Sequence, residues 1–181
     1  MTAKSDLVSI AISIHQQLTA WVVQCLSSCL GQSHLSIEVL VRIDGPEGAD
    51  SSVICMLEAW QRQDSRLRWW QEQRRRGTFG SYRCLMAASR GSFLAKVDAD
   101  DWLAPKAIAR CLGVFADHSA AGMVYSRFCA VDAEGKPLHL APPTRPHDSQ
   151  FGLLAGLMAF HLRLLRRSAY ELVGGTGPFT S

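Results

Sequence analysis

The sequence has 181 residues, of which 48% are hydrophobic and 19% are charged. This length suits one domain with a substantial buried core and is short for two, so we expect residues 1–181 to form a single domain. Nineteen basic and sixteen acidic side chains give a formal net charge of +3. That balance excludes the strong basic field on which nucleic-acid binding depends, and we predict no nucleic-acid partner.

The first two-thirds of the sequence alternates short apolar runs with segments of helical periodicity. We expect strands at residues 7–14, 37–43, 67–70 and 92–98. Helices are expected at residues 20–30, after Asp50, at 81–90 and from Pro105 on, with Thr19 and Asp50 as N-caps and a polar loop over residues 74–80.

Strands that alternate with helices predict an α/β fold with a mostly parallel sheet covered on both faces. Ligands of such sheets bind at the carboxyl ends of the strands, where the strand order reverses. We therefore expect the polar residues that end strands to gather at one edge of the sheet. They are Ser13, His15, Asp44, Asp98 and Asp100.

After Gly122 the pattern changes. Residues 123–132 and 136–140 read as the two strands of a hairpin, residues 141–150 as a proline-rich loop, and residues 166–173 as a last helix that ends at Gly174. Residues 151–165 are apolar, but charged and polar side chains interrupt them and they are short for a membrane span of roughly 20 residues. We expect a buried segment and no transmembrane helix, with peripheral contact to a membrane surface as the open alternative.

The start of the chain and its cysteines both indicate the cytoplasm. The apolar run at residues 7–14 is short and lacks a signal-peptide cleavage site. The six cysteines show no disulfide framework. Cys25 and Cys29 share one helical face, where they either pack in the core or ligate a metal; core packing is the expectation, because no second cysteine or histidine pair accompanies them.

The segment Asp98-Ala99-Asp100-Asp101 places three carboxylates directly after an apolar strand. Carboxylate oxygens in this arrangement suit Mg²⁺ or Mn²⁺, and a divalent ion would neutralise the charge on a departing diphosphate. The structural alternative is that Asp98 ends the strand, Asp101 caps the next helix, and nothing binds.

Several segments in order resemble the motifs of family 2 glycosyltransferases with the GT-A fold. They are VSIAISIH, CLSSCLGQ, IEVLVRIDGP, RRRGTFGSYR, ASRGSFLAKVDADDWLAPKAI and LRLLRRSAYELVGG. The resemblance implies a Rossmann-like, mostly parallel sheet flanked by helices, with a C-terminal β-hairpin. It also implies an inverting, metal-dependent transfer of sugar from a nucleoside diphosphate sugar, first of all a UDP-sugar, to a hydroxyl of a glycan or lipid-linked acceptor.

The resemblance also implies roles for single residues. Ser13 and His15 match positions that contact the nucleobase, and Asp44 matches a carboxylate that accepts a hydrogen bond from a base N–H. Asp98 is expected near the ribose or sugar hydroxyls, and Asp100 is expected to hold Mn²⁺ or Mg²⁺. For Asp44, a turn-forming residue before glycine is the structural alternative.

Other positions depart from the family pattern or stay open. Arg83 stands in the expected nucleotide-sugar site where many members carry Asn, and His15 stands where many carry an aromatic residue. The three arginines of the loop, Arg74, Arg75 and Arg76, either reach a diphosphate or form a solvated basic loop, and the second is favoured.

The resemblance places a general base some residues beyond the Gly-Gly motif, and no Asp or Glu follows Gly174. We therefore expect the base and most of the acceptor site to lie beyond Ser181 and the chain to be truncated before them. An alternative is therefore a domain that binds the nucleotide-sugar donor but does not catalyse sugar transfer. A nucleotidyltransferase is a less favoured alternative, because residues 13–20 contain no glycine for a phosphate loop.

Overall fold

The computed structural model describes residues 6–140 and 162–175. The strands are β1 (Val8–Ile14), β2 (Ile37–Ile43), β3 (Leu67–Gln71), β4 (Phe93–Asp98), β5 (Met123–Tyr125), β6 (Cys129–Val131), β7 (Pro137–Leu140) and β8 (Arg163–Arg166). The helices are α1 (Thr19–Leu30), α2 (Ser51–Gln63), α3 (Gly77–Ala88), α4 (Ala107–Asp117) and α6 (Arg167–Leu172).

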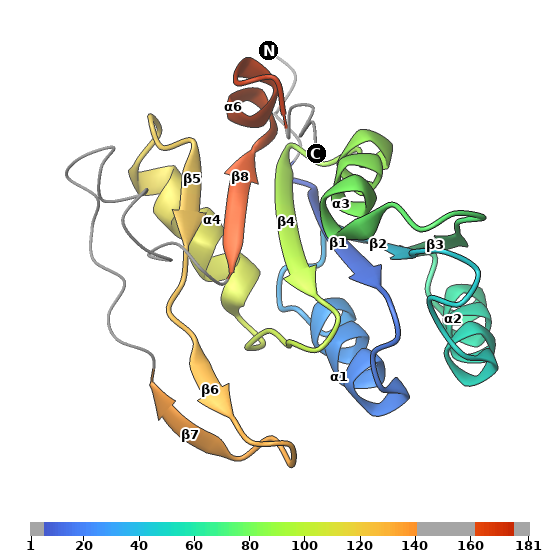
Figure 1. Ribbon diagram of the computed structural model, residues 1–181. Coiled ribbons are helices and arrows are strands. Elements are labelled where there is room, and N and C mark those ends of the chain that lie inside the picture. The colour runs from blue at the N-terminus through green and yellow to red at the C-terminus, as the bar shows by residue number, and fades with distance from the viewer. Residues whose placement is uncertain (1–5, 141–161, 176–181) are drawn as a thin grey trace.

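The main sheet has the strand order β3-β2-β1-β4-β8-β5 (Figure 1). Strands β3, β2, β1 and β4 are parallel, whereas β8 is antiparallel to both of its neighbours. Strands β6 and β7 form a separate antiparallel hairpin. The predicted fold class, a mostly parallel α/β sheet with a hairpin after it, is confirmed. The strand order reverses between β1 and β4, which makes their carboxyl ends the expected place for a ligand.

Helices cover both faces of this sheet. Alternate residues of β1, such as Ile10 and Ile12, pack in the larger core with side chains of α1, α2 and α4. The residue between them, Ala11, faces the other way and packs with Leu40 and with Leu85 of α3. All seven residues of β2 are buried. Burial on both faces explains why the sequence of β2 is almost continuously apolar.

Several element boundaries differ from the prediction for identifiable reasons. Thr19 is the first residue of α1 and not its cap, because its hydroxyl lies 2.8 Å from the hydroxyl of Ser52 on α2. Asp50 does cap α2, accepting a hydrogen bond from the Val53 N–H at 3.0 Å. Helix α4 begins at Ala107, so Pro105 lies in the turn before it.

The carboxyl-terminal part of the sheet was not fully predicted. Strand β8 falls in the apolar run that we expected only to be buried, and Leu164 at its centre is indeed fully buried. Helix α6 lies within one residue of the prediction. The predicted proline-rich loop at 141–150 and the apolar residues 151–161 lie outside the described residues.

Two further expectations concern membranes and metals. Within the described ranges, no helix has both the length and the apolar character required to cross a membrane. Cys25 and Cys29 are fully buried in the larger core, so their predicted role in packing is confirmed. In the same ranges, no group of three or more His, Cys, Asp or Glu side chains forms a ready-made metal cage.

A buried carboxylate organises the amino-terminal ends of the strands. Glu38 is 1% exposed, and its Oε1 accepts hydrogen bonds from the Ser9 hydroxyl at 2.7 Å and the Arg90 N–H at 2.6 Å. Its Oε2 accepts from Arg90 Nε at 2.9 Å and lies 3.4 Å from Arg68 Nη1. Burial acts to raise the pKa of Glu38, but these donors outweigh it and hold the pKa below the usual value. Glu38 therefore joins β1, β2 and β3 to the turn before β4.

We expect Glu38→Gln to lower the free energy of unfolding by about 2–3 kcal/mol, because a charge that accepts several hydrogen bonds is replaced by a neutral amide that presents donors to donors. Urea unfolding at pH 7 measures the change. Glu58→Gln on the exposed face of α2 is the matched control and should change stability by less than about 0.5 kcal/mol. Equal midpoints for Glu38→Gln and the wild type would contradict this role.

Candidate functional site

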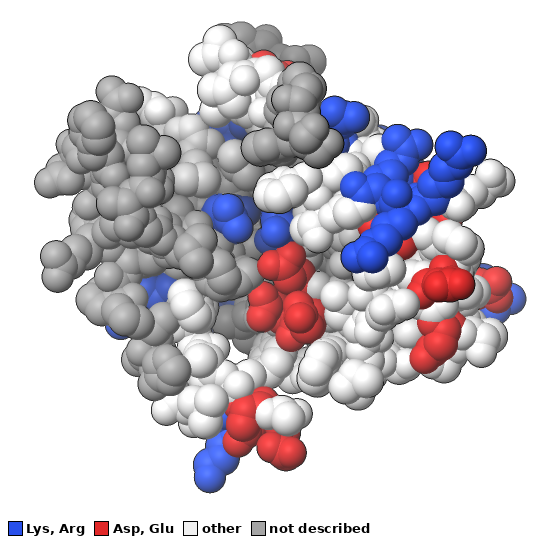
Figure 2. All heavy atoms as spheres, viewed as in Figure 1, with Lys and Arg blue, Asp and Glu red and all other residues white. Residues whose placement is uncertain are grey.

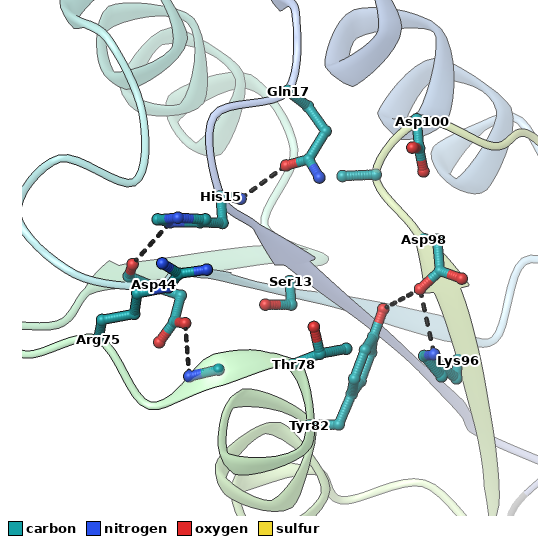
Figure 3. Close-up of a pocket in the computed structure, with 12 residues that line it drawn as sticks. Ser13, His15, Gln17, Asp44, Arg75, Thr78, Tyr82, Lys96, Asp98 and Asp100 are labelled. Carbon is teal, nitrogen blue, oxygen red and sulfur yellow. Dashed lines mark hydrogen bonds and ion pairs between the residues drawn. The ribbon is translucent and has the colours of Figure 1, made fainter.

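A pocket of about 330 Å³ opens at the carboxyl ends of β1, β2 and β4, against the start of α3 (Figure 3). This is the edge where the strand order reverses. The residues that line it are Ser13, His15, Gln17, Asp44, Arg75, Gly77, Thr78, Tyr82, Lys96, Asp98, Ala99 and Asp100. In Figure 3 the side chains of Asp44, His15 and Arg75 lie at one end of the pocket, and those of Asp98, Lys96 and Asp100 lie at the other.

The pocket brings together five residues that the sequence placed at strand ends, namely Ser13, His15, Asp44, Asp98 and Asp100. Arg83 is the exception. It is exposed on α3 and does not line the pocket, whereas its neighbour Tyr82 does. Successive residues of a helix point about 100° apart, so the two side chains cannot share a direction. The role predicted for Arg83 stays a prediction.

Asp44 is a buried carboxylate that fixes the beginning of α3. It is 2% exposed, and its two oxygens accept hydrogen bonds from the backbone N–H groups of Arg76 and Gly77, each at 2.8 Å. Burial acts to raise the pKa of Asp44, but these bonds and the charge of Arg42 outweigh it and hold the pKa below its usual value. Asp44 is thus ionised at neutral pH, and each oxygen keeps a second lone pair for a further donor.

The turn after β1 sets the position of His15. The backbone N–H of His15 donates to Gln17 Oε1 at 2.6 Å, and His15 Nδ1 lies 3.1 Å from the carbonyl oxygen of Asp44. Gln16 has a φ of 65°, in the left-handed region that non-glycine residues seldom adopt. Its N–H donates to the Gly48 carbonyl at 2.7 Å, which holds the turn in that shape. The imidazole therefore lies beside Asp44 at one end of the pocket.

At the other end, Asp98 interacts with a tyrosine and a lysine. The Tyr82 hydroxyl lies 2.8 Å from the Val97 carbonyl oxygen and 3.0 Å from Asp98 Oδ1. Lys96 Nζ lies 3.1 Å from the same carboxylate oxygen and 4.5 Å from the centre of the Tyr82 ring. Burial, reinforced by the negative charge of Asp98, raises the pKa of Tyr82 far above its usual value. Tyr82 consequently stays protonated and donates its hydrogen bond at any relevant pH.

The end of β4 has the chemistry of a divalent-metal site that is completed by a ligand. Asp100 is exposed in the pocket, and no described residue pairs with its carboxylate. Oδ2 of Asp98 likewise accepts no hydrogen bond from the described residues, because Tyr82 and Lys96 both approach Oδ1. Mg²⁺ and Mn²⁺ commonly take one or two carboxylates and complete their shell with phosphate and water oxygens. The two carboxylates fit such an ion. Asp101 does not cap α4, which begins six residues later.

Charge is unevenly distributed around the pocket. Figure 2 shows acidic side chains gathered in the middle of this face, near the end of β4, and basic side chains gathered over the loop before α3. Of the three loop arginines, Arg75 lines the pocket, Arg74 is exposed, and Arg76 Nε lies 3.9 Å from Glu72. The loop therefore brings one of its three guanidinium groups to the pocket.

The lining residues that the sequence did not single out include Gln17, Thr78, Tyr82 and Lys96. Thr78 and Tyr82 are four residues apart and so lie on one helical face, but α3 begins at Gly77 and not at Ser81 as predicted. Because residues 74–80 were predicted to form a loop, the shared helical face of Thr78 and Tyr82 was not predicted. Lys96 stands two residues before Asp98 on β4, a spacing that puts both side chains on the same side of the strand. This alternation of side chains along the strand could have predicted that Lys96 lies in the pocket beside Asp98.

The chain matches known proteins over most of its length. The sequence pattern of Glycosyl transferase family 2 matches residues 9–174. Chondroitin synthase of Escherichia coli is 25% identical over 169 residues, which cover 93% of this chain and 24% of that protein. O-antigen biosynthesis protein RfbC of Myxococcus xanthus is 26% identical over 174 residues, covering 96% of this chain and 13% of that protein. The chain thus spans a quarter or less of the length of these curated relatives.

Solved structures share the fold. The mannosyltransferase PcManGT from Pyrobaculum calidifontis, in complex with GDP-Man and Mn²⁺, gives a TM-score of 0.66 at 18% identity over 96% of this chain and 48% of that one. Residues 1–349 of S. aureus TarS, in complex with UDP-GlcNAc, give a TM-score of 0.71 at 15% identity over 92% of this chain and 46% of that one. The predicted GT-A architecture is confirmed.

We expect Asp44→Asn to lower the free energy of unfolding by about 1.5–3 kcal/mol at pH 7, because a charged acceptor of two buried backbone N–H groups is lost. The folded-state pKa of Asp44 lies below the ordinary value of 3.8. The stabilisation is therefore full above that value and is lost as the pH falls through the lower, folded-state pKa.

Urea unfolding of both proteins between pH 7 and pH 3 measures this difference, with Asp117→Asn at the exposed end of α4 as the matched control. The gap between wild type and Asp44→Asn should be constant near neutrality and narrow in acid. A gap that widens toward pH 3 would show that Asp44 is not held in its charged form by the fold.

Proposed function

This chain belongs to glycosyltransferase family 2, and from that membership we propose that it transfers a sugar from a nucleoside diphosphate sugar, with a UDP-sugar as the first choice, to an acceptor hydroxyl. The proposed reaction inverts the anomeric centre and uses Mn²⁺ or Mg²⁺. The observation that carries the proposal is the pocket at the β1/β4 reversal, which has Asp44 and His15 at one end and two carboxylates at the other.

The end formed by Asp44 and His15 fits the nucleobase. Asp44 is held ionised by Arg76 and Gly77 and retains acceptor capacity, so it can take a hydrogen bond from a base N–H. The imidazole of His15 lies beside it and offers a flat surface against which a base can stack. Ser13 lies on β1 between this end and Asp98, its partner in the strand register, where it contacts the nucleoside.

The opposite end fits the ribose and the diphosphate. In the proposal, Asp98 binds sugar hydroxyls and Asp100 holds the metal ion, which when bound neutralises negative charge on the departing diphosphate. The ammonium group of Lys96 adds fixed positive charge at this end of the pocket, whereas Arg75 lies at the other end. Charges already in place where negative charge develops stabilise a transition state without the cost of reorganising solvent.

The names of the similar structures support the donor class. One of them holds GDP-Man with Mn²⁺ and another holds UDP-GlcNAc, which are both nucleoside diphosphate sugars. A glycan or lipid-linked hydroxyl is the proposed acceptor, and Arg83, on the exposed side of α3, is proposed to reach the nucleotide sugar only once it is bound. We propose a cytoplasmic site of action with peripheral membrane contact.

We expect Asp100→Ala to weaken UDP binding in the presence of Mn²⁺ by about 10- to 100-fold, the size typical of impaired metal ligation. Calorimetry with UDP, once with Mn²⁺ and once with EDTA, measures the effect. The variant should retain its thermal stability, because Asp100 is exposed and bonds to no described residue. Asp117→Ala, another exposed aspartate, is the matched control and should bind UDP as the wild type does.

The catalytic part of the proposal is tested by release of nucleoside diphosphate from a panel of UDP- and GDP-sugars with Mn²⁺ and a mixture of glycan acceptors. Transfer above a no-protein control, lost in Asp100→Ala, would support it. Binding of UDP that does not depend on Mn²⁺ would contradict the metal role, and a folded protein that binds no nucleoside diphosphate at all would contradict the function.

A further inference from the structure

A second hollow, a groove of about 910 Å³, lies next to the pocket. Its walls come from the segment between β4 and α4 with the start of α4, and from the segment that joins β5 to β6, with the β6–β7 hairpin beyond it (Figure 1). The turn of the hairpin lies against the groove, because Gly135 lines it and a Cβ built on Gly135 would lie 3.7 Å from a ring carbon of Trp102. Lys96 lines both the groove and the pocket, so the two hollows meet at its side chain.

The lining of the groove combines aromatic rings with basic side chains. Trp102 and Phe128 line it and are partly exposed. An aromatic ring presents a flat face with negative π density, against which the C–H groups of a sugar ring can pack. Flat rings at the wall of an open groove are thus suited to a carbohydrate, which is apolar on the faces of its rings and polar at their edges.

Basic side chains come from both walls. Lys106 directly precedes α4, and Arg110 lies in its first turn, where its N–H donates to the Lys106 carbonyl at 3.0 Å. Arg127 lies in the segment between β5 and β6. All three are exposed, and none of their side chains has an ion pair or hydrogen bond with any residue in the described part of the chain. Among the described residues of the groove, Asp101 is the one acidic side chain, against these three and Lys96.

We propose that this groove binds the acceptor and that the acceptor is an acidic carbohydrate chain, with its ring faces against Trp102 and Phe128 and its carboxylate or phosphate groups beside Lys106, Arg110 and Arg127. The proposal rests on the proposed function, because it is the junction at Lys96 that brings a sugar bound here to the donor. A guanidinium group pairs with carboxylate and phosphate in the same forked geometry. The basic side chains of the groove therefore favour any negatively charged sugar, whether it carries a carboxylate or a phosphate.

Other anionic partners fit the groove less well. A lipid headgroup surface is broad and nearly flat, whereas the basic residues here line a hollow of about 910 Å³. Nucleic acid requires an extensive basic field, and the whole chain carries a net charge of only +3. A chain of acidic sugars can pack its ring faces against the aromatic residues and pair its charged groups with the basic residues at the same time.

The test measures binding of defined tetrasaccharides to the full chain without donor. Tetragalacturonic acid is compared with its fully methyl-esterified form, and a phosphorylated maltotetraose with its dephosphorylated form, so that each pair differs only in charge. Calorimetry should show binding of at least one acidic form at 150 mM salt and at least about 10-fold weaker binding of its neutral counterpart. Which acidic form binds identifies the charged group. Failure of both, or equal binding of a charged and a neutral form, overturns the proposal.

Charge reversal then locates the site. Arg110→Glu and Arg127→Glu change opposite walls, and each should weaken binding of the acidic tetrasaccharide by at least about 5-fold. Arg62→Glu, the same change at an exposed position on α2, should leave it unaltered. An equal loss in Arg62→Glu would show unspecific attraction between charges and overturn the proposal. A second result would also overturn it. In that result the wild-type protein binds phosphatidylglycerol vesicles but no tetrasaccharide, and Arg110→Glu and Arg127→Glu each abolish the vesicle binding.

Binding of UDP with Mn²⁺ separates this proposal from the proposed function. Neither arginine lines the pocket, so Arg110→Glu and Arg127→Glu should bind UDP as the wild type does, which also shows that they are folded. If the wild-type protein binds the tetrasaccharide but no nucleoside diphosphate, the proposed donor site is contradicted and the proposal that the groove binds carbohydrate stands. A protein that binds UDP but no acidic tetrasaccharide would contradict the groove alone.

Discussion

The structure depends on two carboxylates at the two ends of one strand, β2, which hold helix α3 in place. Asp44, after the end of β2, accepts the N–H groups of Arg76 and Gly77 where α3 begins. Glu38, near its start, accepts the N–H of Arg90 just after α3 ends. Both carboxylates are almost completely buried and both have a lowered pKa in spite of that burial. A buried charge is tolerated only when donors surround it, so neither end of α3 can move without exposing an uncompensated charge to an apolar interior.

The anchoring of α3 links the two ends of the pocket. Tyr82 projects from this helix and its hydroxyl meets Asp98 Oδ1 and the Val97 carbonyl at the end of β4. Asp44 therefore contributes twice, through its own carboxylate at the proposed nucleobase end and through the placement of Tyr82 at the proposed diphosphate end. Sites positioned by packed elements and satisfied hydrogen bonds keep their geometry better than sites on free loops. The two ends of the pocket, which we propose for nucleobase and diphosphate, are thus fixed relative to each other by the fold.

The alternation of strands and helices was sufficient to predict most of the sheet and to group Ser13, His15, Asp44, Asp98 and Asp100, because the carboxyl ends of parallel strands share one edge. The remainder depended on long-range contacts that no local pattern reveals. The glycine-rich stretch at 74–80 reads as a loop by intrinsic propensity, yet α3 starts within it, because Asp44, more than thirty residues away, supplies the acceptors for its first N–H groups. Strand β8 is four residues long and becomes a strand only by pairing with β4 and β5.

The last physical consequence concerns Lys96, where an acidic pocket and a basic groove meet. Its ion pair with Asp98, at 3.1 Å, is about one-third exposed on each side, and ion pairs that water reaches contribute little net stability, of the order of 0–1 kcal/mol. Exchanging Asp98 for another anion therefore costs the fold little. In the two proposals, a phosphate bound in the pocket or an acidic sugar bound in the groove would pair with the ammonium group and leave Asp98 Oδ1 with the Tyr82 hydroxyl as its partner among the described residues. Binding on one side of Lys96 would thereby change the charge presented to the other.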